Sequence, residues 1–345
     1  MSLYQSARAV ANARGGETEW IDWRATAEAA KQARNKGILT LDASERRAYA
    51  NDVRDARSQL QTVGGLEFDI PQTIEVQNRH HWIDANINTF ERMLDPVDIA
   101  TLIDDNDALN GPSGYATRMV NTGSMAAALA FLSGNVLGQY DPQLLSNAAN
   151  HDTHSVETSD SQTTDKNAHE LYFVHPNIVA VAAELDVEYP RFRRWIAFHE
   201  VAHAAEFGAA PWLQTHLEDR IESGLEALTG GRLDRSAFSD VDVVMTAVEG
   251  YAELLMDRAF DEAYADLRAK LDARRGGGGP IARLFRRLLG LGMKERQYER
   301  GAQFFETIAD RRGVKAAATV WDDPRHLPDE SELDNPQQWI RRVNP

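Results

Sequence analysis

The chain has 345 residues, of which 43% are hydrophobic and 26% are charged, the balance of a globular protein with a sizeable core. Asp and Glu number 53 against 37 Lys and Arg, so the formal net charge is −16. Because this charge repels phosphate backbones, a general nucleic-acid-binding function is not expected. The absence of cysteine excludes disulfides, thiolate metal sites and cysteine nucleophiles.

Two observations concern location. Residues 1–8 have no basic start followed by an apolar core, so a secretory signal is not expected. The longest apolar stretch, residues 124–138, contains polar residues and is too short for a bilayer span. We therefore expect a cytoplasmic protein that binds neither membranes nor nucleic acids. The sequence does not predict the oligomeric state.

The N-terminal region predicts helices and one strand. Residues 2–60 are rich in Ala, Arg and Glu, and Asp42 with Glu45 three residues later has the pattern of a capping box that begins a helix. The apolar alternation over residues 66–76 predicts one short strand before Pro71.

Helical spacing of apolar residues predicts a helix over 79–93, and the small residues of 119–137 predict a helix in the core. Residues 170–174 form an aromatic and β-branched run that predicts a strand. A helix is expected to begin near Pro190, and a second long helix is expected over 240–266.

We expect a single domain over residues 1–345. Within it, an N-terminal helical part (1–165), a metal-site core (166–270) and a C-terminal helical part (280–345) are distinguished, with a glycine-rich linker at 276–279.

The string His199-Glu200-Val201-Ala202-His203 stands in the helix that follows Pro190. Residues four apart share a helical face, so both imidazoles can bind one metal ion while Glu200 lies beside it. Two imidazoles, a third protein ligand and a water in an open position make a catalytic zinc site. Zinc lowers the pKa of that water to roughly 7, and Glu200 takes its proton as general base. A chance occurrence is the alternative, which the helical context disfavours.

The third ligand is expected from the second long helix. Glu249 and Glu253 are four residues apart and share a face. One carboxylate can bind the metal while the other accepts a hydrogen bond from a ligand imidazole and fixes its orientation. Two solvated carboxylates are the alternative, and the apolar residues around them favour the metal site. Spacing alone permits either glutamate as the ligand.

The chain resembles a known family at this point. The motif continues with Glu206-Phe207 and Pro211-Trp212-Leu213, and further matching stretches lie at 136–141, 249–257 and 294–299 and at Trp339. Over about residues 60–343 the sequence is similar to the zincin-like family of zinc-dependent metalloproteases or hydrolases, whose layout resembles that of glutamate zincins. One branch of this family carries a label that links it to biosynthesis of a deazaflavin coenzyme.

The resemblance implies Zn²⁺ as cofactor, and it favours Glu249 as the third ligand and Glu253 as the carboxylate beside it. Many relatives have a histidine where Tyr251 stands, so a histidine ligand at that position is excluded here.

Residues outside this set are further candidates for a role. Tyr298 is a candidate donor to the oxyanion of a tetrahedral intermediate, with a buried structural tyrosine as the alternative. His80 and His81 are adjacent and point apart on a helix, which argues against a second metal site. The strand over 170–174 is either an edge that pairs with an extended peptide or an interior strand.

These observations predict a mainly α fold with a small β element and a zincin-like metalloprotease architecture. The predicted function is that of a zinc metallopeptidase that cleaves an amide bond of a peptide or a small amide substrate. In it His199, His203 and Glu249 bind Zn²⁺ and Glu200 is the general base. The alternative is a non-proteolytic metal-binding protein with a structural or ligand-binding role, in a coenzyme pathway for example. An open metal position beside Glu200 favours the first, and a closed shell of four protein ligands favours the second.

Overall fold

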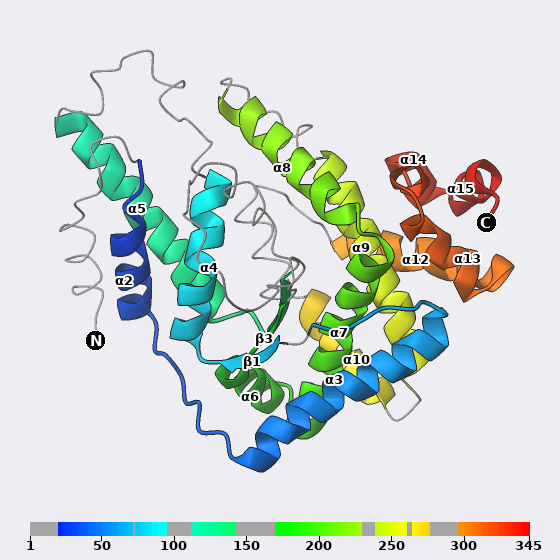
Figure 1. Cartoon of the computed structure of the whole chain (residues 1–345), viewed down its shortest axis with the longest axis horizontal. Helices are drawn as coiled ribbons and strands as arrows, with labels where there is room; N and C mark the ends of the chain where they lie inside the picture. The colour runs from blue at the N-terminus through cyan, green and yellow to red at the C-terminus, as the bar shows by residue number, and fades with distance from the viewer. Residues whose placement is uncertain are drawn as a thin grey trace, which may run out of the picture.

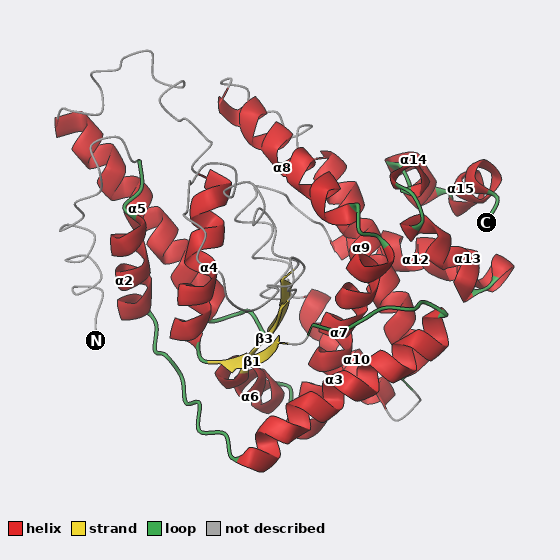
Figure 2. Ribbon diagram, in the orientation of Figure 1, coloured by secondary structure: helices red, strands yellow, loops and turns green. Residues whose placement is uncertain are grey.

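A computed structural model of the chain describes residues 20–71, 73–94, 112–141, 170–229, 239–260, 264–276 and 295–345. It is mainly helical with a small sheet, as predicted (Figure 2). The strands are β1 (Thr73–Gln77), β2 (Gly138–Asp141) and β3 (Glu170–Val174). The α-helices are α2 (Trp23–Ala33), α3 (Ala43–Gly64), α4 (Arg79–Leu94), α5 (Pro112–Ser133), α6 (His175–Glu184), α7 (Tyr189–Ala209), α8 (Leu213–Thr229), α9 (Ser239–Ala259), α10 (Ala265–Gly276), α12 (Glu295–Arg312), α13 (Val314–Ala318), α14 (Glu330–Asp334) and α15 (Pro336–Val343). Two 3₁₀ turns follow α13, at Thr319–Trp321 and Pro324–His326.

Helix α3 begins as its sequence predicts. The Asp42 carboxylate accepts hydrogen bonds from the N–H groups of Ser44 and Glu45 at 2.7 and 2.8 Å. The Glu45 carboxylate in turn accepts from the Asp42 N–H at 3.1 Å. This reciprocal pair satisfies N–H groups that have no partner inside the first turn, and the predicted capping box is confirmed.

The predicted strand before Pro71 is wrong, because β1 begins after it, at Thr73. The Phe68 carbonyl accepts hydrogen bonds from the side chains of Arg57 and Gln61 on α3, at 3.1 and 2.9 Å. The Phe68 carbonyl is therefore bonded to a helix and not to a neighbouring strand, and strand pairing starts only beyond the proline.

The sheet has the order β1-β3-β2, with β1 parallel and β2 antiparallel to β3. The strand over 170–174 is therefore interior, and β2, which the sequence did not predict, is at an edge. The Val174 N–H donates to the Leu137 carbonyl at 2.9 Å. Because hydrogen-bonded pairs alternate along an antiparallel ladder, Tyr140 belongs to a pair that is not hydrogen-bonded, and its N–H points away from β3.

Helices from different parts of the chain lie on the two sides of this sheet. In Figure 1, α2, α4 and α5 lie on one side of it, and α9 and the C-terminal helices lie on the other. The larger hydrophobic cluster runs from Tyr49 on α3 to Ile340 on α15 and includes most of the buried side chains of α7 and α9. A smaller cluster joins α2, α4 and α5.

Two further expectations concern the whole chain. Among the described helices, none is both long and apolar enough to cross a lipid bilayer. The predicted division into parts 1–165, 166–270 and 280–345 stays a prediction. The predicted linker lies outside the described residues, apart from Gly276 at the end of α10.

Candidate metal centre

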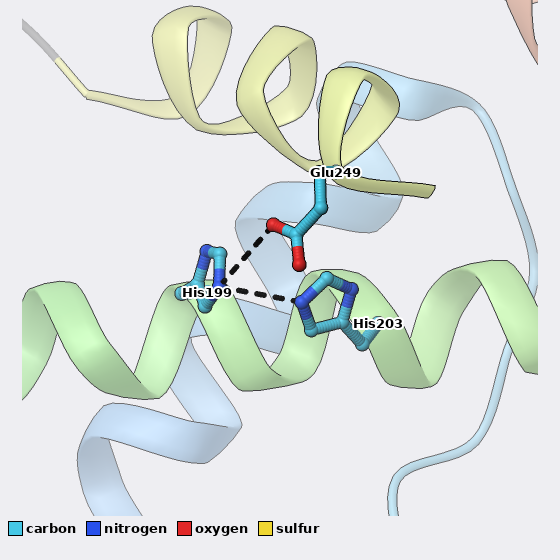
Figure 3. Close-up of side chains that lie close together, drawn as sticks. All are labelled: His199, His203 and Glu249. Atoms are coloured by element: carbon cyan, nitrogen blue, oxygen red, sulfur yellow. Dashed lines mark hydrogen bonds and ion pairs between the residues drawn. The ribbon is translucent and has the colours of Figure 1, made fainter. Parts of the chain in front are cut away.

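Helix α7 presents His199 and His203 on one face, one turn apart (Figure 3). Their Nε2 atoms are 3.3 Å apart and their rings are nearly perpendicular, with an interplanar angle of 78°. The side chains are 18% and 14% exposed. Both imidazoles thus aim the same nitrogen at one point and keep limited access to solvent.

Glu249 on α9 completes a group of three donors. Its carboxylate points toward the two imidazoles (Figure 3), and its Oε2 lies 3.9 Å from Nε2 of His199. One atom from each of the three residues lies within 4.8 Å of the others. Among the described residues this is the one group of three or more His, Asp or Glu side chains with such a geometry.

The donor set and its spacing fit zinc. Donors about 2.0–2.1 Å from a tetrahedral ion lie about 3.3–3.4 Å from one another. The Nε2–Nε2 distance of 3.3 Å has this value, and the distance of 3.9 Å from His199 to Glu249 is somewhat longer. Two imidazoles and one carboxylate are also the ligand types of a catalytic zinc site with an open fourth position.

Glu206 fixes the orientation of His203. Its Oε2 lies 2.9 Å from Nδ1 of His203, and its side chain is fully buried. Because a carboxylate accepts, Nδ1 carries the hydrogen and Nε2 faces the metal position. Burial opposes the charged imidazolium, but the hydrogen bond and charge of Glu206 and the charges of Glu249 and Glu200 together raise the pKa of His203 to about 10. For Glu206, burial disfavours the charged carboxylate and raises its pKa to about 7.

Glu200 lies next to this group and is held by the sheet edge. Its side chain points to β2, where its Oε2 accepts a hydrogen bond from the Tyr140 N–H at 3.0 Å. This is the N–H that points away from β3. Burial raises the pKa of Glu200 to about 7, while the charge of His203 lowers it and the charge of Glu249 raises it. A carboxyl with such a pKa can both accept and release a proton near neutral pH.

The structure places Glu253 in a different contact from the expected one. It forms an ion pair with Arg268 of α10, which also pairs with Asp257. The carboxylate that meets a ligand imidazole is Glu206, to which the sequence analysis gave no role. Its position three residues after His203 was a usable indication, because residues three apart share a helical face.

Tyr298 belongs to α12, but its side chain lies outside the described residues, so its role as an oxyanion donor stays a prediction. His80 lies within hydrogen-bonding distance of the Arg34 carbonyl, with its Nε2 at 2.8 Å from that oxygen.

Comparison with known proteins identifies a family and one similar structure. A sequence model described as zincin-like metallopeptidase matches residues 21–232 and 230–340. The chain is similar to a crystal structure from Chloroflexus aurantiacus, described as a candidate hydrolase with a novel fold. The sequence identity is 27%, the alignment covers 100% of this chain and 99% of that one, and the TM-score is 0.69. No curated protein matches the chain.

Proposed function

The chain belongs to the zincin-like metallopeptidase family, and we propose that it is a zinc-dependent hydrolase that cleaves an amide bond. The observation that carries this proposal is the convergence of His199, His203 and Glu249, with buried Glu200 alongside. Three donors, the number found among the described residues, suit a catalytic site better than a closed structural one.

Each residue has a distinct role in this proposal. His199, His203 and Glu249 would hold Zn²⁺, which when bound lowers the pKa of a water molecule and polarises the carbonyl of the substrate. Glu200 accepts a proton from the attacking water and delivers it to the leaving amine. The Glu200 pKa of about 7 suits both proton transfers. The hydrogen bond from the Tyr140 N–H holds the carboxylate in place from the first transfer to the second.

The edge of the sheet supports a peptide or another extended amide as substrate. Strand β2 is an edge strand, and the N–H of Tyr140 on its outer side is bonded to Glu200. Because this N–H already donates to Glu200, an extended substrate would pair with β2 at residues other than Tyr140, where its amide carbonyl would still lie near the base. Interior strand β3 has no free edge for this purpose.

The test compares wild-type protein with Glu200→Gln, both loaded with zinc, on a mixture of short peptides analysed by mass spectrometry. We expect the wild type to cleave peptides and the variant to be inactive with an unchanged zinc content, because glutamine cannot accept the proton. Equal turnover by both proteins would contradict the proposed base. A wild type that binds zinc and cleaves no amide would favour the non-hydrolytic alternative.

A further inference from the structure

The aromatic side chain of Trp195 lies against the proposed metal ligand His199. The two residues are one helical turn apart on α7, and their rings are stacked with centroids 5.6 Å apart and planes at 7°. Trp195 is 9% exposed, so its indole is nearly enclosed by protein. The His199 imidazole therefore packs against the flat face of an indole ring that is itself buried.

The orientation of an imidazole is not set by its helix alone. The torsion that rotates a histidine ring has broad minima, so the backbone fixes where the ring is attached but not its plane. For His203 the hydrogen bond to Glu206 supplies the missing constraint. For His199 a rotation of the ring would drive its edge into the indole of Trp195, which lies parallel to it.

Trp195 is in turn supported from the preceding turn of α7. The ring of Phe192 lies parallel to the indole, with centroids 6.3 Å apart and planes at 3°. Phe192 is fully buried. The three rings form a row along one face of the helix that ends at His199. Phe198 on the same helix instead packs its ring against Phe260, at 4.6 Å.

We propose that Trp195 is a positioning residue that fixes the plane of the His199 imidazole before metal binds. This inference rests on the proposed metal site and extends it to a residue that does not contact the ion. The interaction between two stacked aromatic rings changes an equilibrium constant that depends on it by roughly two- to tenfold. Loss of the stack should therefore weaken metal binding by about this factor.

The test measures Co²⁺ affinity of the full chain by competition with a chelating dye, together with the melting temperature of each metal-free protein. We expect Trp195→Leu to bind Co²⁺ roughly two- to tenfold more weakly and Trp195→Phe, which keeps a flat ring, to bind nearly as the wild type. Phe198→Leu is the matched control. It also removes a buried aromatic ring from α7, so its melting temperature should fall while its Co²⁺ affinity stays unchanged.

A second measurement checks the contact itself. Bound Co²⁺ quenches nearby indole emission, so Co²⁺ should quench the fluorescence of the wild type more strongly than that of Trp195→Phe. Wild-type affinity in Trp195→Leu, or an equal loss in Phe198→Leu, would overturn the inference. Absence of Co²⁺ binding to the wild type would overturn both the metal site and this inference. Co²⁺ binding without any amide hydrolysis would count against the proposed hydrolase alone.

Discussion

Gly138 on β2 and Glu200 on α7 are packed so closely that a Cβ atom on Gly138 would lie 2.6 Å from both Cγ and Oε1 of Glu200. Real Cβ contacts are longer than this, so the glycine makes room for the proposed base. Two residues later, the Tyr140 N–H binds the same carboxylate. Strand β2 thus positions Glu200 by a close approach at one residue and a hydrogen bond at another.

The first prediction follows from this contact. In Gly138→Ala the added methyl group should displace the Glu200 side chain, because Cγ, one of the two nearest atoms, is not the flexible end of that chain. We expect zinc content near that of the wild type and kcat/KM lowered by about 100-fold, since a displacement of about 1 Å can have that effect. Steady-state kinetics beside metal analysis measures both. Full turnover in this variant would contradict the proposed position of the base.

A second prediction concerns Glu206. Removal of a carboxylate that orients a ligand histidine typically lowers metal affinity about 10–100-fold. We expect this loss in Glu206→Ala, measured by competition with a zinc chelator. Glu206→Gln should lose less, because the amide oxygen can still accept the hydrogen bond from Nδ1 of His203. An equal loss in both variants would show that charge, and not orientation, is what matters.

The third prediction separates the two glutamates of α9. Glu249→Ala removes one of three donors and should be purified almost free of zinc. Glu253→Ala breaks the ion pair with Arg268 and should retain zinc with nearly wild-type affinity. Plasma emission on both purified variants measures the zinc directly. A metal-free Glu253→Ala beside a loaded Glu249→Ala would reverse the assignment.

Features that depend only on residues close together in the sequence could be predicted from local patterns. The capping box at Asp42 and Glu45 depends on four consecutive residues, and it forms as predicted. The convergence of His199 and His203 requires only the periodicity of one helix. Both motifs can therefore be read without knowledge of what packs against them.

Packing between distant segments explains what the sequence analysis missed. Strand β2 is four residues long and begins with glycine, so it has no alternation to detect, and its pairing with β3 bridges distant parts of the chain. Glu206 and Glu253 are both glutamates at helical spacing from a ligand. What separates them is the neighbour of each, since Arg268 comes from another helix and meets Glu253 only in the folded chain.

A fourth prediction concerns the proton that zinc displaces from His203 when it binds. The pKa of His203 is raised to about 10, so at pH 8 its imidazole carries a proton that a metal must displace from Nε2. Zinc binding should therefore release about one proton from His203, in addition to that of a zinc-bound water whose pKa is roughly 7, and the His203 proton makes apparent affinity rise by about tenfold per pH unit below that pKa. Calorimetry in buffers of different ionisation enthalpy counts the protons. In Glu206→Gln one of the three charges that raise the pKa of His203 is gone, and proton release at pH 8 should fall. An unchanged count would contradict this cause.

The last prediction tests how α9 is held in place beside α7. Helix α9 crosses α12 at two glycines, where a Cβ on Gly250 would lie 2.4 Å from the backbone carbon of Gly301. A Cβ on Gly301 would lie 2.3 Å from the Thr246 carbonyl oxygen.

These neighbours are backbone atoms, so Gly301→Ala can be accommodated only if the two helices separate. Overpacking costs about 1–3 kcal/mol, and the preference of a helix for alanine offsets up to about 1 kcal/mol of it, so we expect the free energy of unfolding to fall by up to about 2 kcal/mol. Because Glu249 precedes Gly250 on α9, the same separation should also shift this ligand and weaken zinc binding. Urea denaturation and chelator competition measure the two effects.

The control is Ala302→Ser, which changes the next residue of α12 at a partly exposed position. Gly313→Ala is unsuitable as a control, because the φ of Gly313 is +91° and alanine would be strained there. Gly301→Ala with stability and zinc affinity equal to those of Ala302→Ser would show that the crossing does not position Glu249.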